Sequence, residues 1–264
     1  MNTTIPTITS ITRPTSGLTA GDQYFETDTK SFIIWDGTNW RSWANDGVYS
    51  QVASFDGTND YIDTGTKFDF IQQTCEFSIT CWVKFTDHTS TANNQAILST
   101  NYTGSQKGFY LFYDNRGNNK TLRTLFRAGS SSDISVNNAV SDNDWFHVAV
   151  TCAAGGTQKL YVDGSVIGST AAPSTTTDSA YYNMTLGAGL VSAVTPSYFF
   201  GGYLDEVSFF ESELSSGDIT SLISSHNYTG ATSLYKFEGN ANDSIGNNNG
   251  TNNGATFEGA LVGL

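Results

Sequence analysis

Apolar and polar side chains alternate along much of this sequence, and clusters of Gly, Asn, Asp and Ser separate the alternating segments. Every second residue is apolar within 77–85 and again within 148–152. Because successive side chains of a strand point to opposite faces, this period of two predicts strands with one buried face. Helical periodicity is scarce, so the sequence predicts an all-β sandwich.

An Asp-Gly pair at 163–164 gives the sharpest turn signal, since it joins two alternating arms at 158–162 and 165–167. Both central residues of a type I′ turn need positive φ, which Asp and Gly tolerate, so we predict a hairpin there. The Asp-Gly pairs at 36–37 and 56–57 repeat the signal.

One short helix is predicted near the C-terminus. Ser215 stands three residues before Asp218, as in a capping box, and apolar residues follow at helical spacing. These are Ile219, Leu222 and Ile223. We expect this helix to cover one end of the sandwich.

The chain carries a net charge of −13, and its few Lys and Arg residues never form a run. Binding to a nucleic-acid backbone depends on clustered cations, so we expect no nucleic-acid partner and attribute the acidity to solubility. Residues 1–6 lack the basic and apolar regions of a signal peptide. No stretch approaches the roughly 18 apolar residues of a membrane span, so we expect neither feature.

The three cysteines, Cys75, Cys81 and Cys152, lack metal-ligand spacing. Cys81 and Cys152 fall on the apolar side of alternating segments, so we expect these two thiols to fill the core. An odd number of cysteines without a pairing pattern favours folding in a reducing host cytoplasm.

The N-terminal part reads as an extended Thr-rich arm over 1–14 and an aromatic β-hairpin module over 15–45, before a main domain at 46–264. About 30 residues cannot bury so many aromatic rings alone. The aromatic face must rest on the main domain, on sister subunits or on a larger assembly. The candidate attachment residues are Tyr24, Phe25, Phe32, Trp35 and Trp40.

Four segments of the main domain, in chain order, resemble the laminin-G-like, concanavalin-A-like jelly roll. They are 55–62, 77–84, 145–151 with 160–164, and 203–208. The segment 234–257 resembles what precedes the Phe-Asp-Gly signature in that family, but here it comes last. We therefore predict a circular permutation in which 233–264 supplies edge strands in cis. Strand exchange with an adjacent subunit is the alternative.

The 15–45 module resembles Gly-Asp-x-Tyr-Phe and Trp-Asp-Gly-Thr-x-Trp modules of bacteriophage virion proteins, such as tail fibres and head appendages. This resemblance implies a structural protein of the virion surface that attaches through residues 1–45 to capsid or tail proteins. Such a protein leaves the host by lysis and needs no signal peptide. A docking arm and a trimerisation device both remain open for this region.

Some relatives with this sandwich are glucan hydrolases, so paired carboxylates are the feature to test. A retaining glycosidase needs two carboxyl groups about 5–5.5 Å apart, and no Glu-x-Asp-x-x-Glu pattern occurs. Asp205 and Glu206 are adjacent and should point to opposite sheet faces. His147, which alternates with core positions, should lie on the outer face. We therefore predict a protein without enzymatic activity.

Calcium is implied by the resemblance, since hard cations take carboxylate oxygens from loops. The candidate ligands are Asp56, Asp60, Asp205 and Asp243. The alternative is turn formation through Asx hydrogen bonds, which the sequence favours.

Carbohydrate binding is the predicted recognition function, because sugar faces stack on exposed aromatic rings and sugar hydroxyls pair with Asn, Asp and Arg. Such groups cluster at Asn101, Tyr102, Tyr110, Tyr113, Asp114, Asn115, Arg116, Tyr181, Tyr182 and Asn183. The alternative is that these aromatic rings are half-buried strand residues. The leading prediction is a virion decoration or adhesion protein that binds host-surface glycans. A cellular lectin-like module and a glycoside hydrolase are the competing functions.

Overall fold

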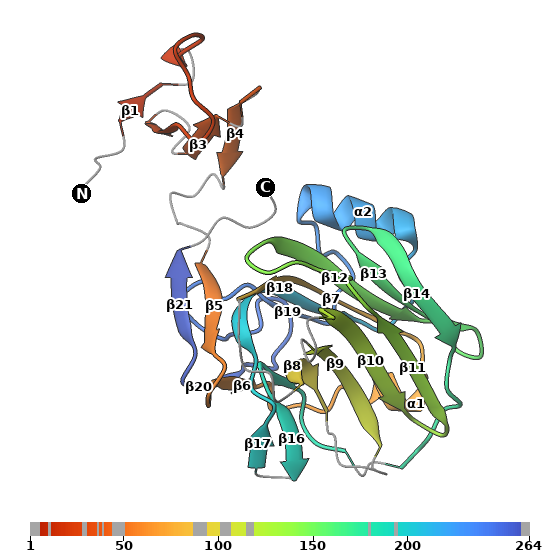
Figure 1. Cartoon of the computed structure of the whole chain (residues 1–264). Coiled ribbons are helices and arrows are strands. Elements are labelled where there is room, and N and C mark those ends of the chain that lie inside the picture. The colour runs from red at the N-terminus through yellow and green to blue at the C-terminus, as the bar shows by residue number, and fades with distance from the viewer. Residues whose placement is uncertain are drawn as a thin grey trace. The chain divides into compact units, whose positions relative to one another are not determined.

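In the computed structural model the chain forms two compact units, 1–50 and 51–264, whose strands and helices are drawn in Figure 1. Each unit is described by itself. The structure describes residues 6–9, 12–27, 31–35, 37–38, 40–43, 51–86, 94–100, 107–114, 119–178, 181–192 and 195–259. Within these ranges no helix has the length and apolarity that crossing a membrane requires.

The N-terminal unit is a four-stranded sheet in the order β1-β2-β3-β4. Its strands are β1 (Thr7–Ile8), β2 (Gln23–Glu26), β3 (Ser31–Trp35) and β4 (Trp40–Trp43). The predicted hairpin corresponds to β2 and β3, but β4 adds a third antiparallel strand. Part of the expected arm also joins the sheet, because β1 pairs in parallel with β2.

A buried ion pair holds this small unit together. The side chain of Glu26 is 1% exposed and accepts two hydrogen bonds from the Arg13 guanidinium, one of them at 3.0 Å from Nη2 to Oε2. A buried carboxylate is costly unless a cation compensates it. Arg13, from the segment before β2, supplies that cation.

The larger unit is a sandwich of two antiparallel sheets. The first has seven strands in the order β11-β10-β9-β8-β15-β6-β20. Their bounds are β11 (Ser131–Val136), β10 (Thr121–Arg127), β9 (Gly108–Asp114), β8 (Gln95–Ser99), β15 (Thr185–Leu186), β6 (Tyr61–Asp63) and β20 (Thr251–Asn253).

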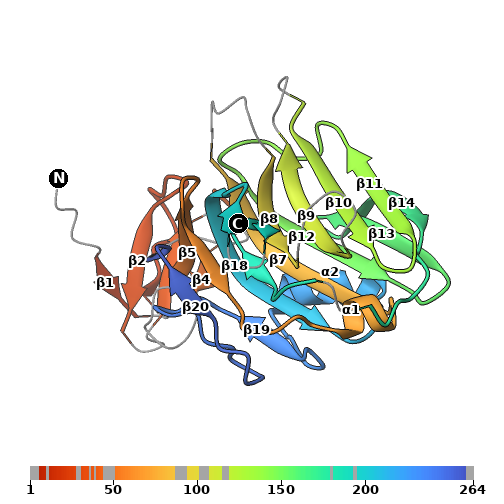
Figure 2. The same cartoon turned by 90° about the horizontal axis from the view of Figure 1, so that it is seen from below.

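The second sheet has eight strands, in the order β14-β13-β12-β7-β18-β5-β21 with β19 also paired to β18. Their bounds are β14 (Ser165–Ala171), β13 (Thr157–Val162), β12 (Trp145–Cys152), β7 (Phe77–Phe85), β18 (Gly201–Phe210), β5 (Gln51–Asp56), β21 (Thr256–Gly259) and β19 (Ser233–Tyr235). A short hairpin of β16 (Gly189–Ser192) and β17 (Thr195–Ser197), a helix α1 (Phe70–Gln73) and a helix α2 (Ser216–Ser225) complete the unit. Figure 2 shows the sandwich from a second direction.

The predicted alternation places the core between the sheets. Five alternate residues of β7, from Phe77 to Phe85, belong to one hydrophobic cluster with Val148, Val150 and Cys152 of β12. All three cysteines are free and buried. Burial raises the pKa of Cys75 to about 11 and that of Cys81 to about 12. Cys75 thus fills the core as well, although the sequence pattern indicated only the other two.

The Asp-Gly pairs have different outcomes. Asp163 and Gly164 have φ of 48° and 77° and join β13 to β14, as the predicted type I′ hairpin requires. The Asp56-Gly57 pair instead joins β5 of the eight-stranded sheet to β6 of the seven-stranded sheet. A turn signal fixes the local backbone but not whether the flanking strands pair. Asp36 lies outside the described residues.

The C-terminal segments pair within the chain. β21 lies at one edge of the eight-stranded sheet beside β5, and β20 lies at one edge of the seven-stranded sheet beside β6. β19 pairs with Val207–Phe209 of β18, on the side where β5 pairs with Gly201–Leu204. Residues 233–259 therefore supply strands in cis.

Helix α2 begins with the predicted capping box. The Ser215 hydroxyl accepts from the Asp218 amide, and the Asp218 carboxylate accepts from the Ser215 amide. Its position differs from the prediction, because Ile219 packs on Ala149 and Tyr161. These two residues alternate with core positions, so α2 covers the outer face of the eight-stranded sheet beside β12 and β13 (Figure 1) and not an end.

Candidate functional site

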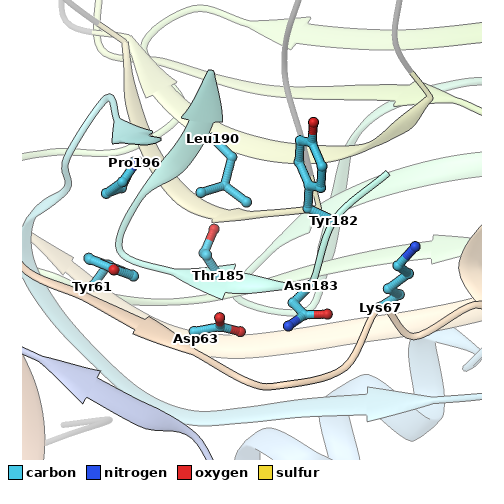
Figure 3. A pocket seen from close by; sticks show the side chains of 8 residues that line it. All are labelled: Tyr61, Asp63, Lys67, Tyr182, Asn183, Thr185, Leu190 and Pro196. Atoms are coloured by element: carbon cyan, nitrogen blue, oxygen red, sulfur yellow. The ribbon is translucent and has the colours of Figure 1, made fainter. Parts of the chain in front are cut away.

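A pocket opens on the outer face of the seven-stranded sheet, and Figure 3 shows the residues that line it. Tyr61 and Asp63 flank Ile62 on β6, and Thr185 precedes Leu186 on β15. Ile62 and Leu186 belong to the core, so alternation turns their neighbours outward.

The remaining walls come from segments that flank these strands. The pocket encloses about 180 Å³, and its lining is completed by Lys67, Tyr182, Asn183, Leu190 and Pro196. Leu190 and Pro196 belong to the β16–β17 hairpin. We call this site the β6–β15 pocket.

Backbone hydrogen bonds fix the segment that carries Tyr182 and Asn183. The Tyr182 amide donates to the Thr100 carbonyl at 2.7 Å, and the Met184 amide donates to the Thr66 carbonyl at 2.7 Å. The Thr64 hydroxyl donates to the Met184 carbonyl at 2.9 Å. Backbone hydrogen bonds of Tyr182 and Met184 therefore fix the segment that carries Tyr182 and Asn183. This limits the rearrangement that ligand binding would require.

Gly187 directs the chain from β15 into the β16–β17 hairpin. Its φ is +82°, which L side chains rarely adopt, and an added Cβ would lie 2.4 Å from the Phe55 ring. Because Gly187 has no side chain, the backbone can pack directly on the Phe55 ring. Beyond this glycine the chain enters β16, which carries Leu190.

The protein itself forms few hydrogen bonds with the polar groups of the pocket. Asp63 Oδ1 accepts from the Gly65 amide at 2.9 Å. Among the described residues, the side chains of Tyr61, Tyr182 and Asn183 and the second Asp63 oxygen make no hydrogen bond. Thr185 differs, since its hydroxyl lies 2.6 Å from the Ala188 carbonyl. Four side chains thus offer donors and acceptors to a bound molecule.

Lys67 stands at one side of the pocket (Figure 3). Its ammonium nitrogen lies 5.3 Å from the centroid of the Tyr181 ring, within the range of a cation–π interaction. The Tyr181 hydroxyl donates to Asp69 at 2.7 Å, and burial together with this bond raises the pKa of Tyr181. Lys67 is therefore supported by a fixed aromatic ring.

Of the ligand residues predicted from sequence, Tyr182 and Asn183 line the pocket. Tyr110, Tyr113 and Tyr181 are each 1% exposed, so their rings cannot stack on a sugar, and this part of the prediction is wrong. Tyr113 faces the core, and Tyr110 stacks on Phe112.

Asp114 is also buried, and Asn101, Tyr102, Asn115 and Arg116 lie outside the described residues. Sequence reasoning missed Tyr61, Asp63, Lys67, Thr185, Leu190 and Pro196. A signal existed for Tyr61 and Asp63, because both flank an apolar residue of an alternating segment.

The four aspartates expected to bind calcium do not form one site. Among the described residues, no group of three or more His, Cys, Asp or Glu side chains is arranged to hold a metal. Asp56 accepts from the amides of Thr58 and Asn59. Asp60 accepts from the Asp56 amide, and Asp205 accepts from the Glu206 amide. The Asp56 bond to Thr58 is the Asx hydrogen bond expected as the alternative, whereas Asp60 and Asp205 accept from other nearby backbone amides.

Asp243 organises the Asn- and Gly-rich segment between β19 and β20. Its two carboxylate oxygens accept from the amides of Leu234, Ile245, Gly246 and Asn248. Burial alone would raise the pKa of Asp243, but the backbone donors outweigh it and hold the pKa below its usual value. The Asp243 carboxylate therefore accepts the hydrogen bonds of backbone amides in a segment that has little regular secondary structure.

A second polar cluster lies on the outer face of the eight-stranded sheet. It consists of Trp82, His147, Asp205, Glu206, His226 and Tyr228, and we call it the α2 cluster. Glu206 has φ of 46°, and the pairing of β18 with β7 shifts between Asp205 and Ser208, which marks a β-bulge. Leu204 and Val207 both face the core, so the bulge turns Asp205 and Glu206 outward together. The prediction that they point to opposite faces is wrong.

One carboxylate oxygen of Glu206 has two partners at this position. Its Oε2 accepts from the Tyr228 hydroxyl at 2.6 Å and lies 2.7 Å from Nδ1 of His226, the C-cap of α2. The hydrogen bond and charge of Glu206 raise the pKa of His226. This carboxylate therefore ties the end of α2 to the sheet.

His147 lies beneath that contact. It is on the outer face, as predicted, but its exposure is 0%, and neither ring nitrogen has a hydrogen-bond partner among the described residues. Its ring meets Trp82 edge-on at a centroid distance of 5.3 Å. Desolvation lowers the pKa of His147 to about 4, so the ring is neutral at pH 7.

The predicted attachment residues fall on the small N-terminal sheet. Tyr24, Phe25 and Trp35 are half-buried on β2 and β3. The side chains of Phe32 and Trp40 lie outside the described residues, although their backbones form part of β3 and β4.

Comparison with solved structures finds the same fold in carbohydrate-binding modules. A sialidase module, "Ruminococcus gnavus IT-sialidase CBM40", has a TM-score of 0.52 and 18% identity, covering 65% of this chain and 97% of that one. A putative carbohydrate binding protein from Bacteroides ovatus ATCC 8483 has a TM-score of 0.59 and 19% identity, covering 93% of this chain and 72% of that one.

The NanB sialidase from Streptococcus pneumoniae has a TM-score of 0.52 and 16% identity, covering 65% of this chain but 27% of that one. The likeness is to a part of that enzyme. A search of curated protein sequences finds no match.

A laminin-G family model, described as the concanavalin A-like lectin/glucanases superfamily, matches residues 56–220, which is more than half of the chain. The match runs from the end of β5 into α2 and contains the whole β6–β15 pocket. The strands β19, β20 and β21 follow it. The sandwich, its order of strands and this match agree: the chain belongs to the concanavalin A-like lectin/glucanases superfamily.

Proposed function

We propose that this protein is a carbohydrate-binding module and that the β6–β15 pocket is its binding site. One observation carries the proposal, namely that unoccupied polar side chains and an apolar wall face each other across a small preformed pocket. In Figure 3 Asp63 and Asn183 lie along one side, and Leu190 lies across from them. A sugar ring has the same division, with hydroxyls at its edge and C–H groups on its faces.

The similar structures support this reading of the pocket. Two of them carry titles that name carbohydrate binding or a carbohydrate-binding module, and one solved form of the R. gnavus module is bound to alpha2,3 sialyllactose. Those ligands belong to those proteins. What transfers to this chain is the suggestion that a domain of this fold can hold a glycan.

The proposal is tested by a glycan array, followed by calorimetry on the ligands it identifies. Tyr182→Ala should weaken binding about tenfold or more, because it removes a pocket wall. Tyr203→Ala is the matched control, since Tyr203 is a half-buried tyrosine on the other sheet. Equal effects of the two variants, or no glycan bound by the wild type, would refute the assignment.

We also propose that the module binds without hydrolysing. Asp205 and Glu206 are the candidate catalytic pair considered from the sequence. In the structure Asp205 is buried, and Glu206 is bonded to Tyr228 and His226. A general acid or nucleophile must reach its substrate. Incubation with oligosaccharides that bind the array should leave them intact, and appearance of shorter products would contradict this.

The N-terminal unit supports a finer proposal, that the module decorates a virion. Residues 1–50 form a compact unit separate from the sandwich, and they carry the segment that resembles phage virion modules. We propose that this unit attaches to capsid or tail proteins and presents the sandwich outward. Mass spectrometry of purified particles should find the chain there, whereas its restriction to the cell fraction would favour a cellular lectin-like module.

A further inference from the structure

Resting on the proposed function, we infer that the β6–β15 pocket takes one uncharged terminal sugar residue, whose hydroxyls bind Asp63, and discriminates against acidic sugars.

The size of the pocket indicates a single ring. Its volume is about 180 Å³, below the roughly 300–1,000 Å³ typical of sites that enclose a drug-sized ligand. A disaccharide is a ligand of that larger kind, so one of its two rings would lie outside. The ring that enters is then the end of a glycan, and further residues add little contact.

Asp63 decides the charge preference. Its Oδ1 is fixed by the Gly65 amide, and its carboxylate points into the pocket (Figure 3). The second oxygen can accept from a sugar hydroxyl, and a bond to an ionised acceptor is stronger than one between neutral groups. A carboxylate on the ligand would instead meet a like charge at close range, which costs binding energy.

Lys67 does not reverse this preference. It lies beyond Asn183 in Figure 3, where its ammonium packs over the Tyr181 ring. Lys67 and Asp63 together leave the lining of the pocket without net charge. The whole chain carries a net charge of −13, so its field also opposes an anionic ligand.

The apolar wall determines the orientation of the ring. Leu190 and Pro196 from the β16–β17 hairpin lie across the pocket from Asp63 and Asn183. A ring with one C–H face on Leu190 turns its other face toward Asp63 and Asn183, where an axial hydroxyl or a hydroxymethyl group can reach them. Both groups of contacts are then made by the same ring.

The experiment compares neutral with acidic sugars, and three pairs, the glycosides of glucose, galactose and mannose and of their uronic acids, differ only by a carboxylate. Calorimetry would measure methyl glycosides of glucose, galactose, mannose and their N-acetylhexosamines against the methyl glycosides of glucuronic, galacturonic and mannuronic acid and of sialic acid. We expect at least one neutral glycoside to bind about tenfold more tightly than its acidic counterpart. A disaccharide ending in the best sugar should bind within about threefold of the monosaccharide.

Two isosteric variants separate the charges. Asp63→Asn keeps the acceptor for the Gly65 amide, so the fold is retained. It should lower the affinity for neutral sugars about tenfold and reduce the difference in affinity between neutral and acidic sugars. Lys67→Met removes the cation of the pocket lining, so it should widen the difference in affinity between neutral and acidic sugars. Lys236→Met, at an exposed lysine outside the pocket, is its matched control.

The outcomes distinguish this inference from the proposed function. If acidic sugars bind more tightly and Lys67→Met abolishes their binding, the protein is a carbohydrate-binding module but the inference is overturned. A disaccharide that binds far more tightly than its terminal sugar overturns the single-ring part. If no glycoside or glycan binds, the proposed function fails, and the inference fails with it.

Discussion

The two outer faces of the sandwich both carry polar and aromatic side chains, but the protein uses them differently. On the seven-stranded sheet the β6–β15 pocket leaves Tyr61, Asp63, Tyr182 and Asn183 available to a ligand. On the eight-stranded sheet helix α2 covers the α2 cluster, and Glu206 binds both His226 and Tyr228.

The difference teaches that polar residues on an outer face do not by themselves indicate a binding site. Polar groups that are covered must be satisfied by the protein or cost stability. Polar groups that remain partly exposed to solvent can form hydrogen bonds with a ligand. Substitutions on the covered face should therefore affect folding, and matched substitutions in the pocket should affect binding.

The largest expected difference comes from a pair of leucines. Leu222→Ala removes a buried contact of α2 and should lower the free energy of unfolding by about 3–4 kcal/mol. Leu190→Ala should cost less, about 2 kcal/mol, because Leu190, although only 6% exposed, borders the pocket and has fewer atoms packed on that side. Urea unfolding measures both. The comparison fails if Leu190→Ala is the more destabilising or leaves glycan affinity unchanged.

The next effect is the pH dependence of stability. The pKa of His147 is lowered to about 4 from 6.5, so the unfolded chain binds more protons between these values. Stability should therefore fall on acidification through this window, by on the order of 2–3 kcal/mol from His147. His147→Phe should remove that part of the slope, measured by urea unfolding at pH 7, 5.5 and 4.5.

His226 has the opposite sign. Its pKa is raised by Glu206, so its stabilising contribution is present at low pH and is lost as the pH rises through the folded-state pKa. His226→Asn, which tolerates the left-handed C-cap conformation, should make the acid-side loss steeper. A shallower profile would show that His226 does not contribute through its charge.

A smaller difference is expected between two carboxylates. Glu206→Gln weakens the acceptor for Tyr228 and His226 and should cost about 1.5–3 kcal/mol of stability. Asp63→Asn should change stability by less than about 0.5 kcal/mol, since its bond to the Gly65 amide remains possible. Thermal unfolding measures the loss of stability in both variants. Equal shifts in Tm would contradict the expected difference between the two sheet faces.

The smallest effect concerns the start of α2. Ser215→Ala removes the side-chain acceptor of the capping box and should cost about 1 kcal/mol. Ser224→Ala, in the last turn of the same helix, is the control and should change stability by less than about 0.5 kcal/mol. Glycan binding should be unaffected by either variant, because α2 lies on the face opposite the pocket.

The sequence predicted those features that depend on neighbouring residues. Alternation in 77–85 requires one face of β7 to be buried, and Asp163-Gly164 can adopt the positive φ values of a tight hairpin. The Ser215–Asp218 capping box is likewise complete within four residues. The hairpin and the capping box are confirmed, and the apolar face of β7 lies in the core as predicted, but the opposite face of β7 is buried as well.

The site was harder to predict because exposure depends on the other segments that cover a residue. Tyr110, Tyr181 and Tyr182 look alike in the sequence, yet Tyr182 alone of these three lines the pocket. Asp63 and Leu190 are brought together by pairing of β6 with β15 and by the turn at Gly187. These contacts join residues far apart in the chain, which no local pattern encodes.

What the sequence by itself determined is the β character of the chain, its hairpin and helix signals, and its likeness to a sandwich family. The β character and the turn and helix signals depend on the period of apolar residues and on backbone preferences of single residues, whereas the likeness rests on the resemblance of particular segments to that family. The tertiary structure alone decided that Glu206 turns outward at a bulge, that α2 covers one outer face, and that a pocket stays open on the other. The physical reason is that burial and hydrogen-bond satisfaction belong to the packed whole and not to any one segment.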